Sequence, residues 1–120
     1  MILVDTSIWI DHLRQGDEQL VKLLNSGLVL GHPLVLGELA CGNLRNRQEL
    51  LGLLKTLPQA RTTETDETLH FLETAKLFGL GLGWVDVSLL ASAQLTGCQL
   101  LTRDRTLARA ATRLGSAGSM

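Results

Sequence analysis

Short apolar runs alternate along the chain with longer segments in which apolar residues recur at helical spacing. Residues 2–4 and 28–30 are apolar runs, and residues 99–102 contain the apolar pair Leu100-Leu101; each segment is followed by a polar residue or a glycine. Such runs are typical of strands that are buried on both faces of a parallel sheet. Residues 60–63 are a weaker candidate for a further strand. The pattern therefore predicts a small parallel sheet.

The segments between these runs are predicted to be helices. Capping side chains precede the first of them, in Asp5-Thr6-Ser7, and Gly79–Gly83 interrupts the pattern later in the chain. The first predicted helix includes Ile8 to Leu13, and the second follows Gly16-Asp17 and ends at Asn25. Further helices are predicted for residues 33–41, 44–57, 64–78, 86–96 and 104–114. The last helix but one is apolar almost all round, which predicts a central position.

Strands that alternate with helices predict an α/β domain, with a central parallel β-sheet flanked by α-helices. The chain has 120 residues and neither an internal repeat nor a linker, so a single domain is expected over residues 1–115. Residues 116–120 have no periodicity and are predicted to be a disordered tail.

Composition narrows the possible partners. The chain is 45% hydrophobic and 19% charged, as in globular proteins, and its net charge of −1 does not predict indiscriminate binding to nucleic acid. Cys41 and Cys98 lack metal or disulfide spacing, which favours reduced thiols and a cytoplasmic location. No apolar run is long enough for a membrane span, so no membrane association is expected.

Four carboxylates lie among apolar neighbours, where desolvation of a charge is costly. Asp5 and Asp104 follow predicted strands at the sheet edge where α/β proteins form their sites. Asp86 lies at a helix start, and Glu38 lies within an apolar helix and is expected to face inward. A shared divalent cation would compensate these charges, but helix capping equally explains each of the three aspartates. Spacing alone leaves both interpretations open.

The same four positions resemble the acidic motifs of the PIN domain. Residues 1–10, with an acid directly after a terminal strand, resemble its opening, and Gly37-Glu38-Leu39 resembles its internal glutamate motif. Residues 83–93 and 100–104 resemble its third and fourth motifs, in the same order. The match covers nearly the whole chain, and the compact length resembles the VapC toxins of type II toxin–antitoxin pairs.

The resemblance implies a metal-dependent RNA endonuclease that hydrolyses phosphodiester bonds. Asp5, Glu38, Asp86 and Asp104 would be its catalytic carboxylates and would hold one or two Mg²⁺ or Mn²⁺ ions. Thr6 and Thr102 would hold waters around the metal, although either residue is equally consistent with an ordinary cap or strand position. The resemblance also implies a VapB-type antitoxin and a homodimer, for which the leucine-rich segments 44–57 and 64–78 are candidate surfaces.

Basic residues in the last predicted helix suggest a contact with RNA. Arg105, Arg109 and Arg113 recur every four residues on one helix face, and Arg103 lies just before them. A positive face that begins at a metal site would attract a phosphate backbone. The alternative is an ordinary solvated face whose cations complement the helix C-terminus.

Two other classes of function are alternatives. A haloacid-dehalogenase-like phosphatase also places an Asp after its first strand, but it needs a second Asp two residues later, where this chain has Ser7. A catalytically inactive PIN-like binding module is the other alternative. With four aromatic residues and no base-reading motif, the sequence predicts no base-stacking platform.

Overall fold

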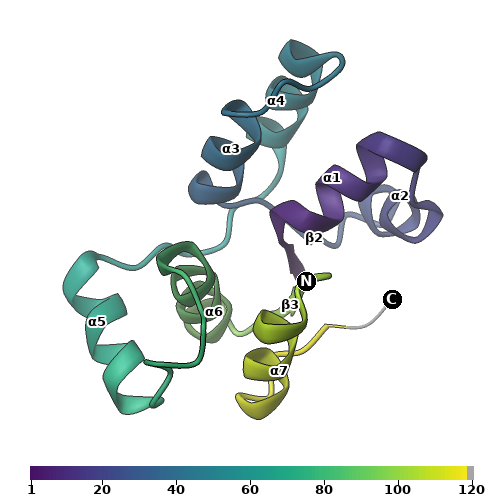
Figure 1. The fold of residues 1–120 in the computed structure, drawn as a ribbon. Helices are drawn as coiled ribbons and strands as arrows, with labels where there is room; N and C mark the ends of the chain where they lie inside the picture. The colour runs from purple at the N-terminus through teal and green to yellow at the C-terminus, as the bar shows by residue number, and fades with distance from the viewer. Residues whose placement is uncertain (119–120) are drawn as a thin grey trace.

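The computed structural model describes residues 1–118, in which seven helices surround a three-stranded parallel sheet (Figure 1). The strands are β1 (Ile2–Val4), β2 (Val29–Leu30) and β3 (Gln99–Leu101). The helices are α1 (Thr6–Gln15), α2 (Glu18–Asn25), α3 (Pro33–Ala40), α4 (Arg47–Thr56), α5 (Thr65–Thr74), α6 (Trp84–Thr96) and α7 (Arg105–Arg113). The predicted α/β class is confirmed.

The first strand of the chain is the centre of the sheet, whose strand order is β2-β1-β3. Leu3 pairs with Leu30 on one side and with Leu100 on the other. All three residues of β1 are buried, because the strand has a neighbour on each edge and helices on its faces. Asp5 directly follows this central strand, so it lies in the middle of the sheet edge formed by the carboxyl ends of the strands.

Helix α6 is the most buried helix in the domain. Every residue from Val87 to Ala93 is buried, and the helix contacts both β3 and α5. A helix with apolar or small residues on all sides can be covered on all sides, as the sequence pattern predicted. Burial holds the first turn of α6, and with it Asp86, in a defined place beside the sheet.

Residues 60–63 do not form the predicted strand. The chain makes one bridge to the sheet, between Gln59 and Gly31, and the Ala60 N–H donates to the Gly31 carbonyl. The next N–H, of Arg61, donates instead to the Thr96 hydroxyl on α6 at 2.9 Å. On the other side of the bridge the chain turns into α3 at Pro33, which has no N–H to donate, so the segment leaves the sheet after a single bridge.

Residues 116–118, the start of the predicted tail, lie beside β3. The Leu100 N–H donates to the Ser116 carbonyl at 2.7 Å, and the Gly118 N–H donates to the Leu100 carbonyl at 2.8 Å. These bonds cover the edge of β3 that is not paired with β1, which would otherwise leave unpaired backbone groups. The ordered domain therefore extends past residue 115, while the remainder of the predicted tail, Ser119 and Met120, lies outside the described residues.

Two helix boundaries differ from the prediction in a way that affects the site. Helix α5 ends at Thr74, and Lys76 then adopts a left-handed backbone with φ of 53°. Helix α6 begins at Trp84, two residues earlier than predicted, so Asp86 lies inside its first turn.

None of the helices that the structure describes has the length and apolar character needed to cross a bilayer.

Candidate active site

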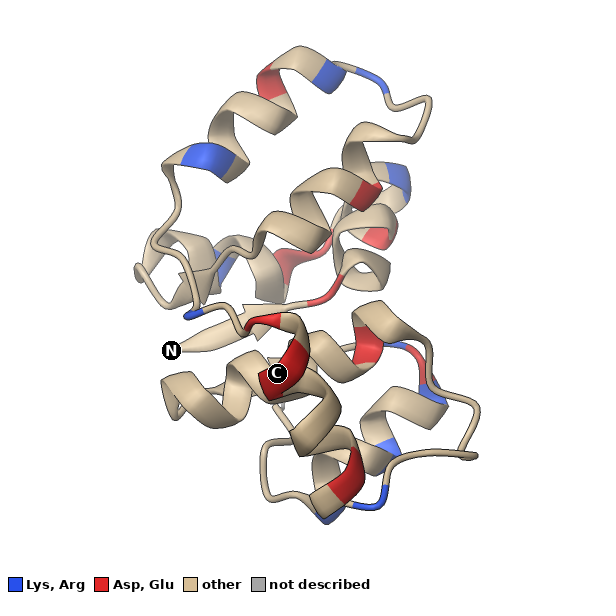
Figure 2. Ribbon diagram, turned by 90° about the vertical axis from the view of Figure 1, so that its left-hand side faces the viewer, with Lys and Arg blue, Asp and Glu red and all other residues tan. Residues whose placement is uncertain are grey.

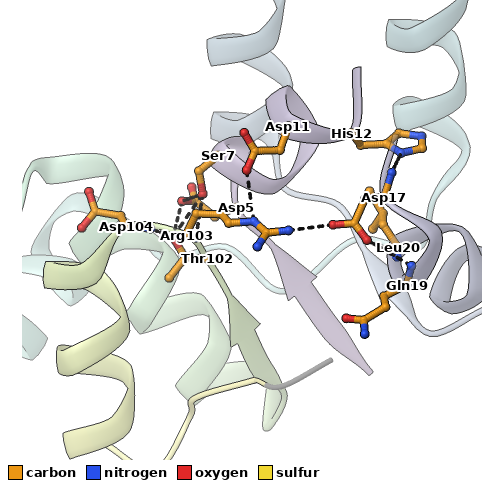
Figure 3. Close-up of polar contacts among 10 residues, drawn as sticks. All are labelled: Asp5, Ser7, Asp11, His12, Asp17, Gln19, Leu20, Thr102, Arg103 and Asp104. Atoms are coloured by element: carbon orange, nitrogen blue, oxygen red, sulfur yellow. Dashed lines mark hydrogen bonds and ion pairs between the residues drawn. The ribbon is translucent and has the colours of Figure 1, made fainter. Parts of the chain in front are cut away.

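Asp5 is a buried carboxylate at the carboxyl end of β1, with only 7% of its surface exposed. One carboxylate oxygen caps α1 by accepting the Thr6 N–H at 2.7 Å. The other accepts the Ser7 hydroxyl at 3.0 Å and the Thr102 hydroxyl at 2.7 Å (Figure 3). Three hydrogen-bond donors therefore satisfy the oxygens of this buried carboxylate.

Asp104 is joined to Asp5 through the turn after β3. The Thr102 hydroxyl donates to Asp5 and accepts the Asp104 N–H at 3.0 Å. The Asp104 carboxylate accepts the Leu107 N–H at 3.0 Å and so caps α7. In Figure 3 this carboxylate points away from Asp5, toward the helix that it caps. Two carboxylates from distant parts of the chain therefore share one sheet edge, although each also stabilises a helix start.

Asp86 reaches the same region from α6. Its carboxylate accepts the Gly83 N–H at 2.9 Å, which completes the first turn of the helix. Burial is the main cause that raises its pKa above the usual value, and the bond from Gly83 opposes this effect. The negative charges of Asp104 and Asp5 raise the pKa further. Asp86 is thus close enough to both carboxylates to be repelled by them.

Glu38 does not face inward as expected, but is exposed on α3. Val35 and Leu39 lie one helical turn apart and fill the buried face, while Glu38 lies about 100° round the helix from Leu39. The Thr6 hydroxyl donates to the Glu38 carboxylate at 2.7 Å. Glu38 is therefore joined to Asp5 through a single residue, without the desolvation penalty that its apolar neighbours in sequence suggested.

The threonines predicted to hold waters contact carboxylates directly in this structure. Thr6 joins Asp5 to Glu38, through its N–H and its hydroxyl respectively. Thr102 joins Asp5 to the backbone of Asp104. Each threonine therefore connects an element of the sheet edge to a second acidic residue.

The four carboxylates have the right chemistry for Mg²⁺ or Mn²⁺, which prefer hard oxygen ligands. Among residues 1–118, no three acidic, histidine or cysteine side chains are gathered closely enough to form a ready metal site. Asp5, Asp86 and Asp104 each accept a backbone N–H at a helix start, which keeps their oxygens apart. The repulsion felt by Asp86 is what a cation would relieve, so the residues fit such an ion.

The predicted arginine face is divided between two roles. Arg103 forms ion pairs with Asp11 at 3.1 Å and with Asp17 at 2.9 Å. Arg113 donates to the backbone carbonyls of Ala75 and Lys76. Within the described chain, Arg105 and Arg109 make neither a side-chain hydrogen bond nor an ion pair. Further basic positions lie on other helices of the molecule (Figure 2).

Three polar residues around the site were not singled out from the sequence. Ser7 donates to Asp5 and accepts the Arg103 N–H at 3.0 Å. Asp17 caps α2 through Gln19 and Leu20 and also pairs with Arg103, as Asp11 does. The Ser that follows Asp5-Thr6 and the Asp after Gly16 were visible signals, but as helix caps they gave no reason to expect contacts with a residue so far along the chain.

An α/β domain with carboxylates from β1, α3, α6 and the turn after β3 at one sheet edge has the architecture of a PIN domain. A model of the PIN-domain family matches residues 2–113, and the chain belongs to this family. It is 46% identical over 118 residues to ribonuclease VapC32 from two strains of Mycobacterium tuberculosis, covering 98% of this chain and 95% of the relative. The resemblance to VapC-type proteins is therefore confirmed across the whole length.

Two solved structures share the fold. The crystal structure of FitAcB from Neisseria gonorrhoeae matches with a TM-score of 0.64 at 22% identity, covering 93% of this chain and 94% of that chain. PAE2754 from Pyrobaculum aerophilum matches with a TM-score of 0.63 at 18% identity, covering 95% and 88%. Membership of the PIN family removes the haloacid-dehalogenase alternative, as the Ser at position 7 already indicated.

Proposed function

We propose that this protein is a metal-dependent RNA endonuclease and the toxin of a type II toxin–antitoxin pair. The observation that carries the proposal is the arrangement at the carboxyl end of β1, where the Thr102 hydroxyl joins Asp5 to Asp104 and Asp86 lies near enough to feel both of their charges. Thr6 joins Glu38 to the same arrangement. Full-length similarity to ribonuclease VapC32 supports RNA as the substrate class.

The catalytic residues are Asp5, Glu38, Asp86 and Asp104, which would hold Mg²⁺ or Mn²⁺. Such an ion lowers the pKa of a bound water and neutralises charge on the phosphate oxygens during hydrolysis. The protein orients the carboxylates beforehand: the Ser7 and Thr102 hydroxyls hold Asp5 in place, and the Gly83 N–H orients Asp86. Thr6 keeps Glu38 beside them.

The phosphate contacts are assigned to Arg105 and Arg109, which lie one turn apart on α7. Both are exposed, and α7 begins directly after Asp104, so a chain bound at the carboxylates passes close to them. Arg103 and Arg113 are less suited to this role, because intramolecular partners already take their guanidinium groups. Phosphate contacts of this kind position a nucleic acid without reading its sequence.

The proposed partners are a VapB-type antitoxin and a second copy of the chain. Similarity to VapC32 over the full length supports the antitoxin. Leu53 on α4 and Leu69 on α5 are 47% and 44% exposed, and these apolar side chains are available for a homodimer contact. A toxin that cleaves cellular RNA acts in the cytoplasm, which agrees with the reduced cysteines, Cys41 and Cys98.

Glu38→Gln gives the clearest test of the function, because an exposed carboxylate can be replaced without disturbing the core. The purified chain is incubated with structured RNA in Mg²⁺ or in EDTA, beside this variant and Glu73→Gln as a control at an exposed acid of α5. Cleavage should require Mg²⁺ and fall by a factor on the order of 100 in Glu38→Gln, while the control keeps full activity. Cleavage that survives EDTA, or no cleavage by any form, would contradict the proposal.

A further inference from the structure

A cavity of about 290 Å³ opens between the start of α3, the segment before α5 and the first turn of α6. Its lining combines the apolar side chains of Pro33, Leu34 and Trp84 with the hydroxyl groups of Thr62 and Thr65. Small-molecule sites typically occupy roughly 300–1,000 Å³, so this volume lies at the lower end of that range. A single ring system suits it better than a longer segment of polymer.

The cavity is neutral. Among the described residues that line it there is no Lys, Arg, Asp or Glu. His32, its one titratable residue, is 4% exposed and shares a hydrogen bond of 2.9 Å with the Ser92 hydroxyl. Burial lowers the pKa of His32, which favours its uncharged form. A phosphate or a metal ion would gain little here, whereas an uncharged heterocycle meets both apolar walls and hydroxyl groups.

Two helices connect the cavity to the catalytic carboxylates. On α3, Leu34 lines the cavity and Glu38 lies about one turn further along the same face, about 6 Å along the axis. On α6, Trp84 lines the cavity and Asp86 lies in the same turn. A nucleotide next to the phosphate held at these carboxylates is therefore within reach of the cavity.

Trp84 lines the cavity and has an indole that is exposed enough for stacking. It is 45% exposed, whereas the other tryptophan, Trp9, is 1% exposed and belongs to the core. An exposed indole beside a neutral cavity can stack on the face of a base, which is the interaction that proteins use most for unpaired nucleotides.

We propose that this cavity receives one unpaired nucleobase beside the scissile phosphate, stacked on Trp84, with threonine hydroxyls at its edge. The assignment rests on the proposed nuclease function and adds the part of the substrate that the site recognises. It also replaces the sequence-based expectation of no stacking surface, since one aromatic residue in the right place is sufficient for one base.

The test combines two variants with RNA that lacks single bases. Trp84→Ala should weaken RNA binding and raise KM by about tenfold or more, while Trp84→Phe keeps most of the affinity because it keeps an aromatic face. Phe78→Ala is the matched control, since Phe78 is 58% exposed and does not line the cavity. In the wild type, an abasic nucleotide walked along a short RNA should impair cleavage strongly at one position, and that position should lose its effect in Trp84→Ala.

Fluorescence gives a second readout that does not depend on cleavage. In a Glu38→Gln background, intact RNA should quench the fluorescence of the exposed Trp84. When Trp84→Phe is added to that background, the remaining fluorescence comes from the buried Trp9, and RNA should not quench it. The base pocket would be overturned if Trp84→Ala kept the KM of the wild type, if RNA did not quench the fluorescence and if no abasic position impaired cleavage, in a chain that still cleaves RNA. Such a result would leave the proposed nuclease function intact. A Trp84→Ala chain that changes from dimer to monomer on size-exclusion chromatography would overturn it in favour of a subunit contact.

Discussion

The carboxylates of the site are held in two different ways. On the Asp5 side, a buried carboxylate accepts three hydrogen bonds that join β1, α1 and the turn after β3. On the Glu38 side, an exposed carboxylate accepts one hydrogen bond, from Thr6. The first arrangement makes the acid part of the fold, and the second leaves it replaceable. Stability and activity should therefore respond separately to substitutions on the two sides.

Asp5→Ala and Glu38→Ala should separate these responses most strongly. Removal of Asp5 leaves the Ser7 and Thr102 hydroxyls and the first N–H of α1 without their acceptor, so we expect a loss of about 2–4 kcal/mol in the free energy of unfolding. Glu38→Ala should change stability by less than about 0.5 kcal/mol. Both should abolish RNA cleavage. Urea unfolding and a cleavage assay measure the two effects, and equal destabilisation would remove the distinction.

Thr102→Val should show how far the buried side depends on one hydroxyl. The change keeps the shape of the side chain but removes a donor to Asp5 and an acceptor for Asp104, so we expect about 1–2 kcal/mol of destabilisation. Cleavage should fall more than tenfold. Thr112→Val, at an exposed position on α7, is the control. If both variants behave alike, the contact with Asp5 has no special role.

Arg103→Ala and Arg109→Ala extend the comparison to the basic residues. Loss of the Arg103 ion pairs with Asp11 and Asp17 should lower the free energy of unfolding by only about 1 kcal/mol, because the arginine is half exposed and solvent screens its charge. Its effect on the salt dependence of RNA binding should be small. Arg109→Ala should leave stability unchanged and reduce the salt slope by about one. Binding titrations at several salt concentrations decide the assignment, and the opposite result would return Arg103 to the RNA contact.

The smallest expected effect is the pH dependence due to Asp86. Its raised pKa means that the folded state binds the proton more tightly than the unfolded chain, so this group lowers stability as pH rises through the interval above the usual Asp pKa. Asp86→Asn should remove this contribution, so the variant should be slightly more stable than the wild type at neutral pH. Urea midpoints between about pH 4 and pH 7 measure the difference. A larger pH dependence in the variant would mean that Asp86 is not repelled by its neighbours.

The three aspartates cap helices and also influence one another electrostatically. Asp5, Asp86 and Asp104 each accept a backbone N–H at a helix start. Burial raises the pKa of Asp86, and the charges of the other two aspartates raise it further. The expectation of an inward Glu38 failed for a different reason, since a helix places neighbours in sequence on different faces, and an apolar segment does not bury all of its members.

The sequence by itself determined the strand–helix order, the central burial of α6 and the identity of the four acids, because these depend on local periodicity and on the position of each acid in a motif. Only the tertiary structure decided which contacts those residues make. Arg103 pairs with Asp11 and Asp17, Ser116 pairs with β3, and the segment after Gln59 leaves the sheet for Thr96. Each of these joins residues far apart in the chain, and local pattern contains no record of which distant partner satisfies a given charge or N–H.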